Sequence, residues 1–111
     1  MENRTFEELE ELVKTWAEDK EIYMKSTAEH QLKLTLEEVS ETITEMALYN
    51  NRVHMDIDKV YSEIGDVVVT LINALALFDY EADITHCLNI AYEKISKRTG
   101  KMINGKFTKD I

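Results

Sequence analysis

Two short acidic motifs are the residues of this chain whose types and spacing could do chemistry. Residues 37–41 read Glu-Glu-Val-Ser-Glu, an EExxE motif, and residues 63–66 read Glu-Ile-Gly-Asp, an ExxD motif. Residues three apart in a helix project from one face, so Glu38 pairs with Glu41 and Glu63 pairs with Asp66. If the two helices pack antiparallel, the two carboxylate pairs can face each other.

Four facing carboxylates need a cation. Like charges repel, and a buried charge without a partner either shifts its pKa or demands neutralisation. Mg²⁺ takes oxygen ligands and completes its shell with waters and substrate phosphates. Because neither motif contains histidine or cysteine, the ligand set favours Mg²⁺, with Mn²⁺ as the second choice. The predicted metal ligands are Glu38, Glu41, Glu63 and Asp66.

The EExxE motif alone is more typical of a solvated helix face than of a site. Asp66 is harder to explain by solvation, because it precedes the most apolar stretch of the chain, Val67 to Phe78. The presence of both motifs on neighbouring helices favours the functional interpretation.

The elements that must position these motifs are predicted to be helices. With no proline and three glycines, the chain has few helix breakers. We expect one all-α domain over residues 1–111, a four-helix bundle-like fold with helices at about 6–24, 27–49, 58–78 and 84–98. Thr5, Ser26, Asp56 or Asp58, and Asp83 are candidate N-caps. In the tail, residues 100–111, Asn104-Gly105 predicts a tight turn, which suits a small hairpin or a clasp on a neighbouring subunit.

Apolar residues recur at helical spacing in each predicted helix. In the first they are Phe6, Leu9, Leu12, Val13, Trp16 and Ala17. In the second, Leu32, Leu36, Val39, Ile43, Met46 and Ala47 form a stripe roughly opposite Glu38, Glu41 and Glu45. The third is apolar nearly all round, with a main stripe of Ile57, Val60, Tyr61, Ile64, Val67, Val68, Leu71 and Leu75, and is expected to be buried on several sides.

Charge and cysteine content restrict the partners. The net charge of −9 divides into 20 acids and 7 bases over residues 1–92, and 2 acids and 6 bases over residues 93–111. An acidic body argues against polymeric nucleic acid and against an anionic membrane surface. Cys87, the single cysteine, excludes an internal disulfide, fits the cytoplasm and is expected to be a buried small hydrophobe. A core this small also makes oligomerisation a natural source of burial.

The ordered set of motifs resembles the MazG-like all-α nucleoside triphosphate pyrophosphohydrolases, especially the short phage and bacterial members. The resemblance covers roughly residues 31–107 and includes Gln31, both acidic motifs, the apolar run after Asp66, and the tail sequence from Ala91 to Phe107. It implies an enzyme that hydrolyses a (deoxy)nucleoside triphosphate to the monophosphate and pyrophosphate. It also implies a homodimer or homotetramer with the site near the subunit interface.

Further site residues follow from the resemblance and from their types. By resemblance, Glu37 is an additional ligand or orients the attacking water, and Lys94 and Arg98 reach the phosphates. We expect Glu37 or Glu41 to act as the base. Trp16 could stack on a base or lie in the core. Asn73 could read a base edge or satisfy a backbone group, and Tyr92 could line the pocket or close the bundle end.

Other functions fit parts of the pattern. The chain could be a non-catalytic helical dimerisation module whose acidic stripe only confers solubility. A di-iron carboxylate bundle is disfavoured, because such bundles place Glu-x-x-His pairs on their helices and the sequence has none. Among pyrophosphohydrolases, enzymes acting on dUTP, dCTP or phosphoribosyl-ATP share the same metal ligands, so the sequence does not select the nucleotide.

Overall fold

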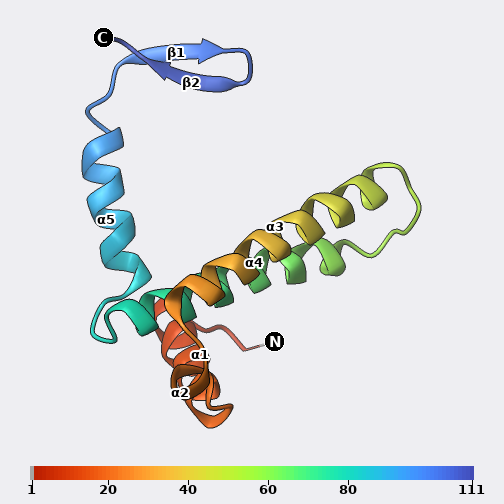
Figure 1. Ribbon diagram of the computed structural model, residues 1–111. Helices are drawn as coiled ribbons and strands as arrows, with labels where there is room; N and C mark the ends of the chain where they lie inside the picture. Colours follow the sequence, from red (N-terminus) through yellow and green to blue (C-terminus); the bar gives the residue numbers. More distant parts are fainter. Residues whose placement is uncertain (1) are drawn as a thin grey trace.

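The computed structural model describes residues 2–111, which are mostly helical (Figure 1). In this part of the chain there are five helices, α1 (Phe6–Asp19), α2 (Ile22–Lys25), α3 (Ala28–Asn50), α4 (Ile57–Phe78) and α5 (Ile84–Ile95), followed by strands β1 (Gly100–Ile103) and β2 (Lys106–Lys109). The all-α character predicted from the sequence is confirmed, with a two-stranded hairpin added at the C-terminal end.

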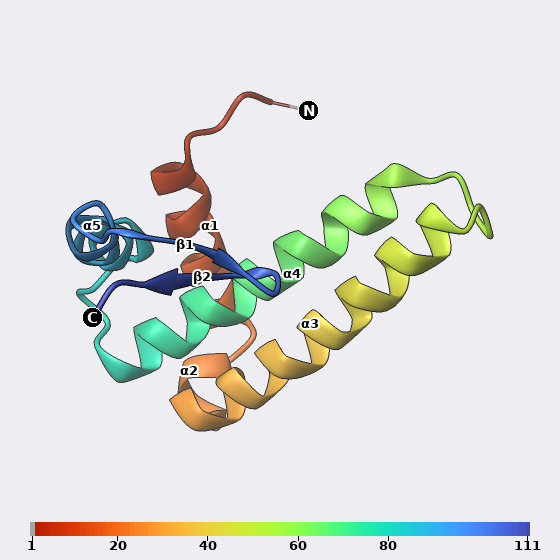
Figure 2. The same ribbon diagram turned by 90° about the horizontal axis from the view of Figure 1, so that it is seen from above.

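The long antiparallel pair of α3 and α4 forms the centre of the fold (Figure 2). Thr27 and Asp56 cap the two helices, each through a side-chain oxygen that accepts from a backbone N–H. The residues buried between them are largely polar and short. The hydroxyl oxygens of Thr35 and Thr70 lie 2.7 Å apart, and Thr42 donates to the backbone carbonyl of Glu38 at 2.7 Å. Such side chains allow the helices to pack closely while their polar groups are satisfied.

Helix α1 packs on α4, and its buried residues are Ala17 of the predicted stripe and two charged residues that the pattern did not place there. Glu10, Lys14 and Ala17 are buried, whereas Phe6, Leu9, Leu12 and Trp16 are exposed. The buried charges have specific partners in the α4–α5 connection: Glu10 Oε2 accepts from the Ile84 N–H at 2.9 Å, and Lys14 Nζ donates to the Tyr80 carbonyl at 2.9 Å. Lys14 Nζ also lies 4.2 Å from the centre of the Tyr80 ring. Polar contacts therefore outweigh the apolar stripe here.

The first predicted helix, 6–24, is two helices. It breaks after Asp19, and Glu21 takes a left-handed conformation with φ of 63° before α2 begins. The cap of the next helix is Thr27 rather than Ser26. The last predicted helix is also shorter than expected, because α5 ends at Ile95 instead of residue 98. The Thr5 capping box and the Asp83 cap are confirmed.

Helix α5 and the hairpin stand away from the other helices (Figure 1), and in residues 2–111 no side chain of α5 is buried. Asn104 and Gly105 both have positive φ, as a two-residue hairpin turn of type I′ requires. The radius of gyration is 16.7 Å, whereas a compact chain of this length would have about 13 Å. A single copy therefore does not close the four-helix bundle that the sequence predicted, and Cys87, expected to be buried, is exposed.

Among residues 2–111, one helix, α4, is long and apolar enough to cross a membrane by length and composition alone. It packs along α3, however, and carries Glu63 and Asp66 near its middle. Carboxylates at that depth are costly in a bilayer, and the core helix of a soluble protein has the same composition. These features favour a soluble protein.

The buried Glu10 gives a test of the α1 packing. We expect Glu10→Ala to lower the free energy of unfolding by about 1–3 kcal/mol, because the Ile84 N–H loses its acceptor. Glu11→Ala is the matched control, since Glu11 is exposed and its carboxylate lies 4.0 Å from Lys14 Nζ. Such a long ion pair at the surface contributes about 0–1 kcal/mol. Urea unfolding at a fixed protein concentration measures both. Equal stability of the two variants would contradict the polar anchoring of α1.

Candidate metal centre

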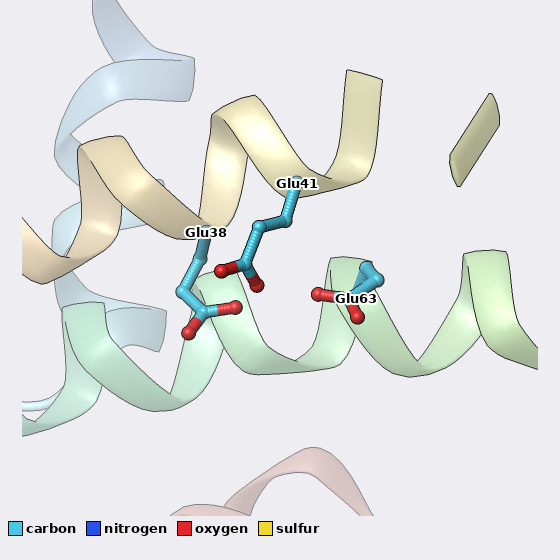
Figure 3. Close-up of side chains that lie close together, drawn as sticks. All are labelled: Glu38, Glu41 and Glu63. Atoms are coloured by element: carbon cyan, nitrogen blue, oxygen red, sulfur yellow. The ribbon is translucent and has the colours of Figure 1, made fainter. Parts of the chain in front are cut away.

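Three of the predicted ligands converge at the middle of the α3–α4 pair. Glu38 and Glu41 extend from α3 toward Glu63 on α4, and one carboxylate oxygen from each lies within 4.8 Å of the other two (Figure 3). The EExxE spacing places Glu38 and Glu41 on one face of α3, and the antiparallel packing brings Glu63 opposite them. The two-helix arrangement expected from the sequence is therefore present at these three residues.

The packing contacts between α3 and α4 also bring the carboxylates close together. Glu38 lies one turn before Thr42 on the flank of α3 that turns toward α4, and the Thr35–Thr70 contact holds the helices together about one turn away. Because α3 and α4 are antiparallel, Glu41 lies one turn further along α3, beside Glu63. No hydrogen bond to a cationic side chain is formed by any of these three carboxylates within residues 2–111.

The carboxylates are electrostatically unsatisfied. Glu38 Oε2 and Glu63 Oε2 are buried and have no hydrogen-bond partner among the described residues. Desolvation, followed by the charges of Glu41 and Asp66, raises the pKa of Glu38 to about 6. The same three causes, in the same order, raise the pKa of Glu63. Desolvated, mutually repelling carboxylates with free oxygen atoms are the environment that a divalent cation stabilises.

Asp66 stands beside this cluster rather than inside it. It is exposed, which differs from the apolar surroundings expected from its sequence context, but its charge acts on both Glu38 and Glu63. Asp66 also lines a pocket with the exposed apolar face of α1. The other lining residues are Leu9, Leu12, Val13, Trp16 and Val69. A carboxylate thus adjoins an apolar pocket next to the three clustered glutamates.

On the other side of the cluster, a polar hollow runs toward the α3–α4 connection. It consists of two adjoining cavities that share Glu45 and Glu63, with Ser40, Glu41, Thr44, Asp56, Asp58, Lys59 and Ser62 as their remaining lining residues. Sequence reasoning missed Lys59 as a site residue. The available signal was its position four residues before Glu63, one turn away on the same face of the helix.

His54 bonds two residues that line this hollow, Glu45 and Asp56. Its Nδ1 accepts from the Asp56 N–H at 3.2 Å, so Nε2 carries a proton and donates to Glu45 Oε2 at 2.7 Å. The neutral tautomer satisfies both contacts. Glu45 is thereby held in a pair with His54, although it lies one helical turn from Glu41 on the same acidic face.

Several sequence-predicted site residues lie outside the cluster. Glu37 is exposed on α3. Tyr92 and Lys94 are on the exposed α5, and Arg98 follows it, so a single copy does not bring them to the carboxylates (Figure 1). Asn73 is only 2% exposed and accepts a hydrogen bond of 2.8 Å from the Tyr23 hydroxyl. Asn73 was expected to read a base edge or to satisfy a backbone group, and the structure instead pairs it with the Tyr23 side chain.

Trp16 is exposed to 48% and lines the pocket beside Asp66, so the interpretation that it belongs to the core is wrong for this chain alone. Together, the cluster offers oxygen ligands to a hard cation, an apolar pocket on one side and a polar hollow with Lys59 on the other. Comparisons with family models, curated proteins and solved structures find no match.

The raised pKa of Glu38 predicts how the metal-free protein responds to pH. The folded state binds the Glu38 proton more tightly than the unfolded state, so this group destabilises the fold above about pH 6, and the penalty disappears as the pH falls through about 4.5. In chelator, Glu38→Gln should therefore be more stable than the wild type at pH 7, by about 1 kcal/mol after allowing for solvent screening.

The difference between Glu38→Gln and the wild type should shrink toward zero at pH 4.5, as measured by urea unfolding at each pH. Comparing the two proteins at the same pH cancels the titration of all other carboxylates. A wild type that is the more stable of the two at pH 7 would mean that the carboxylates do not repel as the geometry indicates.

Proposed function

We propose that this protein is a Mg²⁺-dependent nucleoside triphosphate pyrophosphohydrolase that releases a nucleoside monophosphate and pyrophosphate. One observation carries the proposal: Glu38, Glu41 and Glu63 converge from two helices, with two buried oxygens that lack a partner among residues 2–111. Structural carboxylates are normally paired or solvated, whereas the Oε2 atoms of Glu38 and Glu63 are neither. The residues that would hold Mg²⁺ are these three and Asp66, and Mn²⁺ would suit the same oxygen ligands.

The surroundings of the cluster support a nucleotide as the ligand. The apolar pocket of Trp16, Leu12 and Asp66 can accept a flat base on one side of the carboxylates. The polar hollow with Lys59 can accept phosphates on the other side. Trp16 on one side of the proposed metal site suits the base of a nucleoside triphosphate, and Lys59 on the other side suits its phosphates.

The proposed reaction is attack of water on the α-phosphorus. A bond forms between the water oxygen and that phosphorus, the bond to the bridging oxygen of the β-phosphate breaks, and pyrophosphate leaves. Glu41, between Glu38 and Glu63 in Figure 3, takes the water proton. Mg²⁺ would supply charge neutralisation of the phosphates in the transition state. Lys59 steadies the departing pyrophosphate.

The wider setting is also a proposal. A cytoplasmic enzyme fits the single cysteine, and a (deoxy)nucleotide such as dUTP or dCTP, or phosphoribosyl-ATP, is equally compatible with the ligands. A purely structural dimerisation module is the second candidate, because it accounts for the exposed apolar residues of α3, α4 and α5. It does not account for the unpartnered carboxylate oxygens.

The enzymatic proposal predicts pyrophosphate release that depends on Mg²⁺ and on the cluster. With a panel of (d)NTPs, the wild type should release pyrophosphate rather than single phosphate, and Glu38→Gln or Asp66→Asn should lower kcat/KM by roughly 100-fold or more. Mg²⁺ should also raise the melting temperature of the wild type but not that of Glu38→Gln, because binding to the folded state alone stabilises it.

Glu29→Gln is the matched control, since Glu29 lies exposed in the first turn of the same helix and away from the cluster. It should keep both activity and the response to Mg²⁺. Absence of pyrophosphate release with every nucleotide, together with no response of the melting temperature to Mg²⁺ or Mn²⁺, would leave the dimerisation module as the better description.

Trp16 provides a test of base placement, because it is the only tryptophan of the chain. A nucleotide with Mg²⁺ should quench its fluorescence, whereas inorganic pyrophosphate with Mg²⁺ should not. Trp16→Ala should raise KM about tenfold at nearly unchanged kcat, as expected for loss of a base–aromatic contact worth about 1–3 kcal/mol. Met24→Ala serves as control, because Met24 is 81% exposed on α2. An unchanged KM would remove Trp16 from the substrate site.

A further inference from the structure

The pocket beside Asp66 offers a ligand almost no polar groups. Its cavity of about 350 Å³ falls within the range of about 300–1,000 Å³ that is usual for small-molecule sites. Five of its six lining side chains are leucine, valine or tryptophan, and Asp66 supplies the only side-chain oxygen atoms. An ionised carboxylate accepts hydrogen bonds and donates none. The chemistry of the pocket is therefore that of an apolar slot with a single strong acceptor.

The backbone around the pocket adds no donor to this set. The lining residues of α1 run from Leu9 to Trp16, and those of α4 are Asp66 and Val69 in the interior of that helix. Helical hydrogen bonds engage the N–H groups of these residues. Even at the start of α1, the Leu9 N–H donates to the Thr5 carbonyl at 3.0 Å. A ligand in the pocket therefore finds no free backbone N–H on these residues.

The indole nitrogen of Trp16 is the remaining polar atom of the pocket. Trp16 is 48% exposed, so a flat ligand can reach its ring. The indole N–H is a donor that lies in the plane of the ring, whereas a base stacked on the ring carries its polar edge in a parallel plane. The N–H is thus poorly aligned with the edge of a stacked base, which leaves Asp66 to bind that edge.

We propose that Asp66 selects nucleotides whose base carries an exocyclic amine, namely adenine, cytosine and guanine, over uracil, thymine and hypoxanthine. The inference rests on the proposed function, because it names the class of base that the same site takes. An amine N–H donates to a carboxylate, as in the recognition of cytosine N4 by acidic side chains. Uracil has a carbonyl oxygen in place of that amine, and two acceptors facing each other repel.

Asp66 can bind a base amine and still belong to the proposed metal centre. Glu38, Glu41 and Glu63 form the convergent set of ligands without it. Asp66 is exposed beside that set, and it is the one acidic residue that also lines the apolar pocket. A carboxylate has two oxygens with about four lone-pair sites between them. One side chain can therefore accept from an amine while it contributes charge to a cation.

The wild-type protein tests the inference without any substitution. Trp16 is the only tryptophan, so quenching of its fluorescence reports a base in the pocket. The probes are α,β-imido analogues with Mg²⁺, because their α–β link resists the proposed cleavage. The dGTP and dITP analogues differ by one amine, and the dCTP and dUTP analogues by an amine in place of a carbonyl. The amine-bearing member of each pair should bind at least about tenfold more tightly, as expected for a hydrogen bond to a charged group.

Two variants of the pocket assign the preference to Asp66. Asp66→Asn should bind the two members of each pair about equally, because an amide both donates and accepts. Leu12→Ala is the matched control, since it removes an apolar side chain of the same pocket. It should weaken all four analogues by a similar factor and leave their ratios unchanged. Helical circular dichroism checks that both variants fold.

Several outcomes would overturn the inference. They are equal binding within each pair by the wild type, no quenching by any analogue, or an unchanged preference in Asp66→Asn. If Asp66→Asn binds no analogue, the wild-type pairs decide. Pyrophosphate release separates this inference from the proposed function. Release at equal kcat/KM from amine-bearing and amine-free nucleotides would refute the selection and leave the enzyme, whereas selective binding without release would support the selection and refute the hydrolysis.

Discussion

Mutual repulsion of carboxylates held at the centre of a close helix pair is the constraint on which the rest of this structure depends. Thr35, Thr42 and Thr70 let α3 and α4 approach, and that approach brings Glu38, Glu41 and Glu63 together. Such an arrangement lowers stability unless a cation is bound, since desolvation and like charge both disfavour the ionised form. The contact that packs the two helices is therefore also the one that brings the carboxylates together.

The sequence predicted the helices better than their orientation. Periodicity located α3, α4 and α5 to within one to three residues, and the spacing of the two acidic motifs identified three residues that converge. Periodicity reports that a face is apolar, but not what covers it. The stripe through Leu36 and Ile43 was recognised as apolar, and the structure leaves it exposed.

The sequence pattern could not predict the surroundings of residues whose partners lie far away along the chain. Glu10 and Lys14 look like solvated charges, and only the α4–α5 connection, some 70 residues later, supplies their partners. With Glu10 and Lys14 buried, Trp16 and Leu12 lie exposed. Lys59 and Asn73 likewise have neighbours that are distant in the chain. Lys59 lines a hollow with Glu45 of α3, and Asn73 is bonded to Tyr23.

The pair between His54 and Glu45 bears on how many ligands the proposed metal centre could use. The acidic face of α3 continues past Glu41 to Glu45, which would make a fifth anionic donor. Because the imidazole keeps Glu45 occupied at the mouth of the helical hairpin, four carboxylates remain available. The loop histidine would thus act on the proposed metal centre from outside it, by withholding one carboxylate.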